Sequence, residues 1–318
     1  MKPWVLAVGG TGGHLLPALA LKKRLKGPVW MMGKGLKKHT LTKDLPHAIE
    51  VAAANRNPFR LALGLFQSLW HLLRLRPKAV IGFGSYHSLP VCLAALLLRI
   101  PLHLYEYNVR AGKVSRWLSR FAKSSGVVFK ETDLKGTVHT VAPLLMHEQK
   151  ASRTEAAAYF GLDPEKKTLL IFGGSQGALF LNRVAEQIGP FGKSWQVVHL
   201  TGANKQGRPA ENWCVRAFEE RMDLAWSLAD LALCRAGAGT ICEARAYGVY
   251  TLFVPYRYAG GHQKANADLM AELGCGESME EVLGSERIAK RVMELMQEEK
   301  MPAARQVPSK ALFEQVVL

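Results

Sequence analysis

The sequence of 318 residues predicts an α/β protein of two domains, each built on a parallel sheet. Short β-rich runs alternate with helical stretches along the first half, which is the pattern of parallel strands joined by helical crossovers. The same alternation restarts near residue 168, and each half opens with a strand that leads into a glycine-rich loop. Because a typical domain has ~100 to 200 residues, two domains are expected for a chain of this length.

The expected strands of the first half are 4–8, 29–32, 79–82 and 102–105, and its expected helices are 15–25, 59–75 and 88–98. In the second half, strands are expected at 168–172, 196–200, 231–234 and 251–254, with helices near 178–188, 239–247 and 263–273. A polar, charged connection between Pro143 and Arg153 predicts the boundary, which divides the chain into residues 1–145 and 146–304. A C-terminal helix at about residues 305–318 is expected to pack back on the first domain.

Positive charge is concentrated in the first domain. The chain has a formal net charge of +16, and residues 1–143 alone carry 22 Lys and Arg against 5 Asp and Glu. The remaining residues hold 20 basic and 21 acidic side chains and are close to neutral. A one-sided charge indicates that one domain faces an anionic surface or ligand, either lipid headgroups or phosphates. A nucleic-acid-binding protein would also be basic, but it should show aromatic residues interleaved on a basic face rather than paired glycine loops.

The cysteines and the hydropathy pattern limit the remaining classes of protein. The spacing of the five cysteines matches neither a metal site nor a disulfide framework, which favours a reducing cytoplasm. No run reaches the ~18 to 20 apolar residues of a membrane-spanning helix, and Met1 leads into a strand without a signal-peptide segment. Any membrane contact is therefore expected to be peripheral.

The first glycine loop, Gly9 to His14, follows a strand and opens a helix. Bare backbone N–H groups and the positive end of a helix dipole bind phosphate at such a place. The loop lacks the third glycine of the dinucleotide fingerprint and an acidic residue about 20 positions later, so NAD is disfavoured. The alternative is a tight turn that uses glycine only for its geometry.

The second glycine loop, Gly173 to Gly177, repeats this arrangement, with Ser175 able to donate to phosphate oxygens. Neither loop ends in the Gly-Lys-Ser or Gly-Lys-Thr of a P-loop, so nucleotide hydrolysis is a poor prediction. Further along, Arg235 to Glu243 follows a strand and opens a helix, where the Glu243 carboxylate can accept both hydroxyls of a ribose. Its alternative role is to stabilise the helix dipole. Residues 260–266 supply further side-chain donors after the next strand, or form a solvated loop.

Two more loops of the first domain follow strands. Residues 82–88 precede an apolar helix that Ser88 is expected to cap, and residues 105–108 close the next strand. Ligands of open α/β sheets bind at such carboxyl-end loops. Capping by Ser88 and packing by Tyr107 are the purely structural alternatives.

The expected helix that starts at Phe59 has a wider apolar face than one sheet requires. Its apolar side chains cover about 200° of the helix circumference, twice the ~100° stripe of a surface helix. Arginines flank this face, and a tryptophan within it suits the interface between water and lipid. We therefore expect a partly inserted peripheral helix that contacts an anionic membrane through Phe59, Leu65, Phe66, Leu69, Trp70, Arg60 and Arg74. The alternative is a crossover helix buried on two sides.

Taken together, the motifs resemble those of the MurG family, glycosyltransferases that add N-acetylglucosamine to lipid I during peptidoglycan synthesis. The matching segments are GGTGGHLLPALAL (9–21), GFGSYHSLP (82–90), YEYN with AG and RWL (105–118), GGSQGALFLN (173–182), and CRAGAGTICEARAYG with FVPY and HQKANA (234–267). The resemblance implies a GT-B architecture: two Rossmann-like parallel-sheet domains that face each other across a cleft. The acceptor is expected in the first domain and the UDP-sugar mainly in the second.

The resemblance also implies binding residues, position by position. Those expected to contact UDP-N-acetylglucosamine are Thr11, Gly12, Gly13, Asn108, Ser175, Glu219, Ala238, Gly239, Thr240, Ile241, Cys242, Glu243 and Gln263. Tyr86 is expected beside the acceptor, lipid I. The protein is expected at the cytoplasmic face of the bacterial cell membrane, as a peripheral protein with no nucleic-acid partner. No cofactor or metal is expected to be required, and a divalent cation is expected at most to stimulate the reaction.

The chain departs from the family pattern at three places. The family's Asn-Pro-Val-Arg, whose arginine lies near the UDP, reads APLL (142–145) here, so one donor contact is expected to be missing at Leu145. Glu219 stands where an apolar residue of the family meets the uracil through its main chain, and His-Glu-Gln-Asn reads YEYN (105–108). A degenerate binding module without turnover is therefore one alternative.

The family's reaction inverts the anomeric centre in one displacement, in which the C4 hydroxyl of the muramyl sugar attacks C1 and UDP leaves. A base must take the hydroxyl proton, and the Ser175 loop must stabilise the leaving diphosphate. His14 is the preferred base, since the ordinary histidine pKa of ~6.5 suits proton transfer at neutral pH; Glu106 is the alternate. Hydrogen bonding of His14 to phosphate, or capping of its turn, is the competing interpretation. The alternative function is a related glycosyltransferase with a diacylglycerol-type lipid acceptor.

Overall fold

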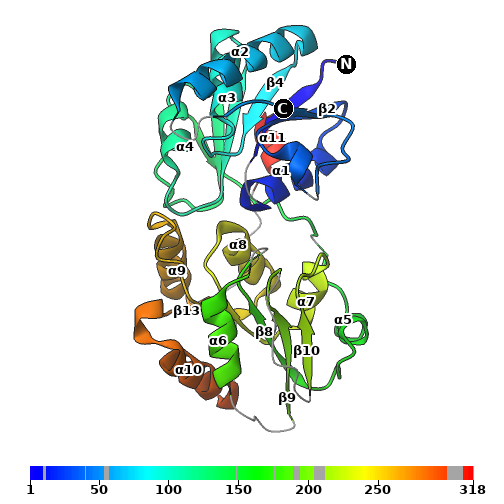
Figure 1. Cartoon of the computed structure of the whole chain (residues 1–318), viewed down its shortest axis with the longest axis vertical. Helices are drawn as coiled ribbons and strands as arrows, with labels where there is room; N and C mark the ends of the chain where they lie inside the picture. Colours follow the sequence, from blue (N-terminus) through cyan, green and yellow to red (C-terminus); the bar gives the residue numbers. More distant parts are fainter. Residues whose placement is uncertain are drawn as a thin grey trace. The chain divides into compact units, whose positions relative to one another are not determined.

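The computed structural model describes residues 1–9, 12–39, 41–53, 57–147, 149–174, 177–188, 194–203, 212–298 and 311–317. The chain forms two compact units (Figure 1), one of Met1–Met146 with Ser309–Leu318 and one of His147–Pro308. Each unit contains a parallel sheet with helices against it. The predicted class, two parallel-sheet α/β domains, is therefore confirmed. The assignment of the acceptor to the first unit and of the donor to the second stays a prediction.

The described residues of the first unit form a seven-stranded sheet in the order β3-β2-β1-β4-β5-β6-β7. The strands are β1 (Trp4–Ala7), β2 (Val29–Gly33), β3 (Ala48–Glu50), β4 (Ala79–Gly82), β5 (Leu102–Glu106), β6 (Ser124–Val127) and β7 (Val138–Thr140). All neighbouring strands run parallel. The strand order reverses between β1 and β4, which is the position at which open α/β sheets commonly bind a ligand.

Helices cover both faces of this sheet. They are α1 (Gly12–Arg24), the short η1 (Leu36–Lys38), α2 (Pro58–Leu75), α3 (Leu89–Leu97), α4 (Lys113–Leu118) and α11 (Phe313–Val317). One core cluster takes Leu72 of α2, Cys92 of α3 and Leu118 of α4, so these three helices cover the same face. Helices α1 and α11 lie on the other face (Figure 1).

The second unit repeats the arrangement with a six-stranded sheet in the order β10-β9-β8-β11-β12-β13. Its strands are β8 (Lys167–Phe172), β9 (Trp195–Leu200), β10 (Trp213–Arg216), β11 (Leu231–Cys234), β12 (Tyr250–Phe253) and β13 (Gly276–Ser278), all paired in parallel. Its helices are α5 (Arg153–Phe160), α6 (Leu179–Gln187), α7 (Met222–Leu228), α8 (Ala238–Tyr247), α9 (His262–Glu272), η2 (Glu281–Leu283) and α10 (Ser285–Gln297). Helices α6 and α10 share one core cluster, whereas α7 packs Trp226 on Phe172 with ring centroids 5.5 Å apart.

The strands that the sequence did not predict are short or polar. Strand β6 reads SSGV, and β3 and β7 have three residues each, without buried side chains. Such segments lack the apolar run or alternation that identifies a strand. They pair because the neighbouring strand already offers its hydrogen-bonding edge.

The C-terminal segment packs on the first unit. Ala311 bridges Val141 in parallel, and Phe313 of α11 is fully buried against β6. A side chain at Gly126 would overlap the Phe313 ring, so the glycine makes room for it. The other side of the ring contacts Tyr105, with centroids 5.2 Å apart. The last residues of the chain therefore complete the core of its first unit.

Replacing Phe313 by alanine should lower the free energy of unfolding of the first unit by about 3 to 5 kcal/mol, the usual cost of removing a buried ring. Hydrogen exchange at the β5 and β6 amides, recorded at increasing urea concentrations, measures this free energy. The matched control is Leu312→Ala, because this neighbour is 39% exposed. A loss for Phe313→Ala no larger than that of the control would contradict this account of the packing.

Candidate active site

The candidate site of the first unit is centred on His14, in the first turn of α1. Its Nδ1 lies 2.8 Å from the carbonyl oxygen of Phe83, which directly follows β4. Because a carbonyl can only accept, Nδ1 carries the proton in this hydrogen bond, and Nε2 of the neutral ring keeps a lone pair. The geometry therefore fixes both the tautomer and the direction of the imidazole, as a general base requires.

Glu106 is the last residue of β5 and is 3% exposed. Its Oε1 accepts from the backbone N–H and the side-chain amide of Asn108, at 3.2 and 2.9 Å, and its Oε2 accepts from the N–H of Gly112 at 3.2 Å. These bonds close the loop between β5 and α4 and orient Asn108. A carboxylate that already accepts three hydrogen bonds is less suited to proton transfer than His14, which favours His14 of the two proposed bases.

Gly84 marks the place where these groups converge. A Cβ added to this residue, whose φ is +77°, would lie 3.0 Å from Ser115 Oγ, 3.7 Å from His14 Cε1 and 3.8 Å from Glu106 Oε2. Ser115 of α4 is 1% exposed, and its hydroxyl has no hydrogen-bond partner among the described residues. Glycine at position 84 thus keeps open the space that three polar side chains of three different elements line.

The other predicted residues of the first unit lie in loops or at helix ends. Gly12 begins α1, and Tyr86 is half-exposed in the loop between β4 and α3; Thr11 lies outside the described residues. The predicted capping role of Ser88 is wrong: its backbone is helical rather than extended, and its hydroxyl donates to the carbonyls of Gly84 and Ser85 at 2.6 and 3.0 Å. It closes the loop and leaves the N-terminus of α3 without a side-chain cap.

The candidate site of the second unit is the start of α8, after β11. The first backbone N–H groups of α8, from Ala238 to Thr240, have no intrahelical partner because they lie at the start of the helix. The N-cap residue is Gly237, which has no side chain to accept from them. Ile241 and Cys242 are buried, and the Ile241 N–H already donates to the Gly237 carbonyl at 3.0 Å, so the contacts predicted for these two residues stay a prediction. The start of α8 therefore has the form of an anion site made of backbone donors.

Glu243 lies one turn further along α8. Its Oε2 accepts from Trp226 Nε1 at 2.9 Å, and the ring of Trp226 is fully buried. The residue keeps some exposed surface, but its carboxyl lies deep among protein atoms, and this burial raises its pKa to about 7. The hydrogen bond from Trp226 opposes the shift only in part. A ligand hydroxyl that donated to this carboxylate would supply the stabilisation that its ionised form lacks.

Two further predicted donor contacts have defined surroundings. The Glu219 side chain is buried and accepts from Arg216 Nη1 at 2.6 Å and from Tyr159 OH at 2.9 Å. Its carboxylate is therefore occupied by protein donors, which leaves only its main chain for the predicted contact. The Gln263 Oε1 accepts from the N–H of Tyr256 at 2.9 Å, which turns the amide nitrogen the other way. Ser175, predicted at the diphosphate, lies outside the described residues.

Helix α2 divides its wide apolar face between the core and the surface. Leu65 and Leu69 pack against the core, so the prediction that they belong to the membrane-facing side is corrected: this side of the helix covers the sheet. A continuous outward stripe remains, which we call the α2 apolar face: Phe59, Leu63, Phe66, Trp70 and Leu73, each at least 51% exposed. Arg60 and Arg74 are exposed beside it. Among the helices that the structure describes, none is long and apolar enough to cross a membrane.

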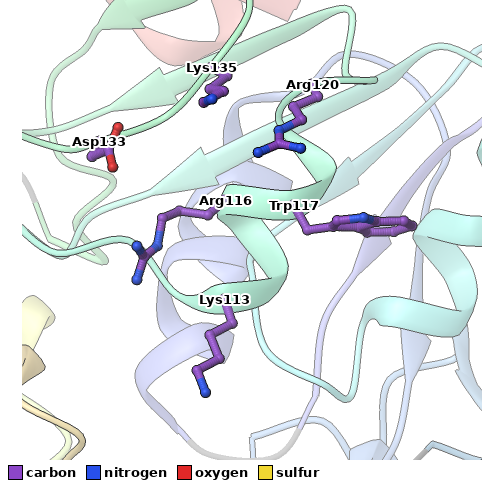
Figure 2. A pocket seen from close by; sticks show the side chains of 6 residues that line it. All are labelled: Lys113, Arg116, Trp117, Arg120, Asp133 and Lys135. Carbon is purple, nitrogen blue, oxygen red and sulfur yellow. The ribbon is translucent and has the colours of Figure 1, made fainter.

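A basic pocket of about 420 Å³ lies on α4 and the loop before β7 (Figure 2). Its walls combine four cations with one acid and one aromatic ring: Lys113, Arg116, Arg120, Lys135, Asp133 and Trp117. Trp117 also contacts the exposed Phe121, with centroids 5.5 Å apart. The described residues contain no group of acidic, histidine or cysteine side chains with the arrangement of a metal site.

Comparison with known proteins assigns the family. The chain matches the glycosyltransferase family 28 N-terminal domain over residues 4–127 and the C-terminal domain of that family over residues 168–316. It is 36% identical over 307 residues to the UDP-N-acetylglucosamine–N-acetylmuramyl-(pentapeptide) pyrophosphoryl-undecaprenol N-acetylglucosamine transferase of Protochlamydia amoebophila, covering 86% of this chain and 81% of that protein. The crystal structure of Acinetobacter baumannii MurG is similar with a TM-score of 0.79 and 29% identity, covering 100% of this chain and 98% of that one. The chain belongs to the MurG family of glycosyltransferases.

The family resemblance inferred from the motifs is thus confirmed. A MurG-family transferase of Thermus thermophilus is also 36% identical, over 325 residues that cover 92% of this chain and 91% of that protein. The spinosyn forosaminyltransferase SpnP has a TM-score of 0.69 at 12% identity, covering 93% of this chain and 90% of that one, so it shares the fold alone. These similarities establish the GT-B fold class of the two units and make the chain a glycosyltransferase.

Several residues of the candidate sites were not found by sequence reasoning. Phe83 contributes through its carbonyl and Trp226 through its indole N–H, and both partners are distant in sequence from the residues they orient. Ser115 is one polar residue in a short helix, without a motif that singles it out. For Tyr107, whose hydroxyl donates to the Gly13 carbonyl, the sequence contains one signal. Pro17 stands four residues after Gly13 and has no N–H, so the Gly13 carbonyl lacks its usual helical donor.

If ribose hydroxyls donate to Glu243, the affinity for UDP should depend on pH. With a pKa of about 7 the carboxyl is ionised above neutral pH and protonated below it. Binding should therefore weaken as the pH falls, by roughly tenfold between pH 8 and pH 6. Calorimetric titration with UDP measures this dependence, and Glu243→Gln should bind weakly and almost equally at both pH values. A wild-type affinity that does not vary with pH would contradict the assignment.

Proposed function

We propose that this chain transfers N-acetylglucosamine from UDP-N-acetylglucosamine to the C4 hydroxyl of the muramyl sugar of lipid I, with inversion, and so forms lipid II in peptidoglycan synthesis. The printed activity of the relatives supports the donor and the acceptor. The hydrogen bond from His14 Nδ1 to the Phe83 carbonyl is the observation that carries the chemistry, because it presents Nε2 as a proton acceptor. A diacylglycerol-type acceptor is the alternative that the test must exclude.

In the proposed mechanism, the C4 oxygen forms a bond to C1 of the sugar while the bond from C1 to the UDP oxygen breaks. His14 Nε2 takes the proton of the hydroxyl, and UDP leaves with the electron pair of the broken bond. Fixing the imidazole beforehand removes the cost of orienting it during the reaction. Asn108, which Glu106 orients, is proposed to contact donor sugar or acceptor.

Donor binding is proposed to use mainly backbone groups of the second unit. The outward N–H groups at the start of α8, together with the Ser175 loop, would hold the diphosphate and stabilise its growing negative charge. Glu243 would accept from the ribose, Glu219 would meet the uracil through its main chain, and Gln263 would contact the sugar. A cofactor is not part of this proposal, and a divalent cation would at most stimulate transfer.

We further propose that the first unit binds the cytoplasmic face of the cell membrane as a peripheral protein. Three observations support this. The α2 apolar face exposes three aromatic rings beside two arginines, the basic pocket offers cations for lipid phosphates, and the net positive charge of the chain lies in residues 1–143. Apolar side chains inserted at the headgroup boundary and cations beside them are the usual elements of such binding.

The His14→Ala variant tests the proposed base. Turnover with UDP-N-acetylglucosamine and a lipid I analogue should fall ~100-fold or more, while UDP affinity stays within about twofold, because the second unit is proposed to hold most of the UDP. Transfer of labelled sugar measures turnover, and UDP titration measures affinity. Parallel assays with EDTA test whether a divalent cation at most stimulates transfer, as proposed. His139→Ala, on the exposed β7, is the control. Near-normal turnover of His14→Ala would reject the base, and wild-type transfer to diacylglycerol but not to lipid I would favour the alternative function.

The double variant Phe66→Ser/Trp70→Ser tests the membrane proposal. Binding to vesicles of phosphatidylglycerol should weaken at least tenfold, because two large rings no longer leave water on binding. Sedimentation with vesicles measures it. Val282→Ser removes an apolar side chain that is 82% exposed in the second unit and should not change binding. Equal binding of wild type and double variant would show that α2 does not contact the lipid.

A further inference from the structure

The first turn of α1 contains a backbone carbonyl that the helix itself cannot satisfy. In an α-helix the carbonyl of residue 13 accepts from the N–H of residue 17, four positions later. Here that position is Pro17, inside α1, which has no N–H and whose ring crowds the carbonyl four residues before it. The Gly13 carbonyl therefore needs a donor from outside the helix.

Tyr107 supplies this donor. It follows Glu106, the last residue of β5, and its hydroxyl donates to the Gly13 carbonyl oxygen. The two residues are 94 positions apart in sequence, so parallel pairing of the sheet brings them together. The Tyr107 side chain is only 4% exposed, so water does not replace its hydroxyl easily. A tyrosine hydroxyl thus takes the place of the backbone N–H that Pro17 removes.

The Tyr107 ring is itself held in place. It stacks on Tyr105 with centroids 5.8 Å apart and an interplanar angle of 28°. Tyr105 in turn contacts Phe313 of the C-terminal helix, and its hydroxyl accepts from the N–H of Leu144 at 2.9 Å. Because the C-terminal segment fixes Tyr105 and Tyr105 fixes Tyr107, the position of the Tyr107 hydroxyl is set by packed side chains rather than by a mobile loop.

The peptide group that Tyr107 holds is the one that joins Gly13 to His14. On its other side, the imidazole of His14 is held by the Phe83 carbonyl, and the edge of the Tyr107 ring approaches it with centroids 6.3 Å apart. We propose that Tyr107 is a positioning residue for His14: its hydroxyl replaces the donor lost at Pro17 and so fixes the backbone from which the imidazole projects. The kinetic consequence rests on the proposed function, in which His14 is the base.

The test is a double-mutant cycle between Tyr107 and Pro17. Tyr107→Phe keeps the ring and removes the hydroxyl, and it should lower kcat ~10-fold with the KM for UDP-N-acetylglucosamine within about twofold. Pro17→Ala gives the helix its own N–H back, so adding Tyr107→Phe to the Pro17→Ala background should change kcat by less than about twofold. Tyr250→Phe, which removes a hydroxyl from the second unit, is the matched control and should leave kcat unchanged.

A second readout does not need turnover. In a protein labelled with ¹⁵N at histidine, the His14 ring signals, assigned by their loss in His14→Ala, should show a proton on Nδ1 in the wild type. Tyr107→Phe should broaden or shift these signals, and the Pro17→Ala background should restore them.

The outcomes separate the two hypotheses. If the wild type transfers sugar and Tyr107→Phe equals it in both readouts, the positioning role is rejected and the proposed function stands. An equal loss in both backgrounds would assign Tyr107 a packing role only and also reject the proposal. If the wild type transfers nothing, the proposed function fails, and the ring signals alone decide whether Tyr107 positions His14.

Discussion

Parallel pairing is the constraint on which the rest of this structure depends. Each parallel strand must be followed by a crossover, so all strands of a sheet end at the same edge and the following loops meet there. In the first unit this brings together His14, Gly84 and Glu106, which lie after β1, after β4 and at the end of β5. The topology of the sheet therefore brings these residues together although they are far apart in sequence.

The two units use this common plan for different chemistry. The first unit offers an imidazole whose Nδ1 donates to a backbone carbonyl, buried polar side chains and an exposed apolar helix face, on a background of positive charge. The second offers outward backbone N–H groups and a carboxylate whose pKa is raised to about 7 by burial. A buried carboxylate on an otherwise near-neutral domain suits a ligand that brings hydroxyls, whereas a basic surface suits phosphate or lipid headgroups.

Several residues of the first site are oriented by hydrogen bonds from other parts of the first unit. His14 is aligned by the Phe83 carbonyl, Asn108 by Glu106, and the peptide before His14 by Tyr107. Tyr107 stacks on Tyr105, which in turn contacts Phe313. Helix α11 packs on β6, and its Phe313 contacts Tyr105, so a residue from the last described helix supports the side chains behind the first site. The same packing explains why Gly126 has no side chain.

The amino-acid sequence by itself determined the fold class, the main strands and helices, the family and the loops that carry candidate residues, because apolar periodicity, glycine loops and charge distribution are local properties. It also showed the excess apolar surface of α2. Only the tertiary structure decided that Leu65 and Leu69 lie against the core while Phe66 and Trp70 are exposed. The periodicity of a helix does not specify which part of a wide apolar face packs on the sheet. The same is true of Ser88, whose hydroxyl closes its own loop, and of the short strands that pair only because a neighbour offers an edge. The partners of His14 and Glu243 are distant in sequence and act through a carbonyl and an indole, so no motif could have identified them. For Gly13, Pro17 indicated only that a donor was missing, and the structure identified Tyr107 as that donor.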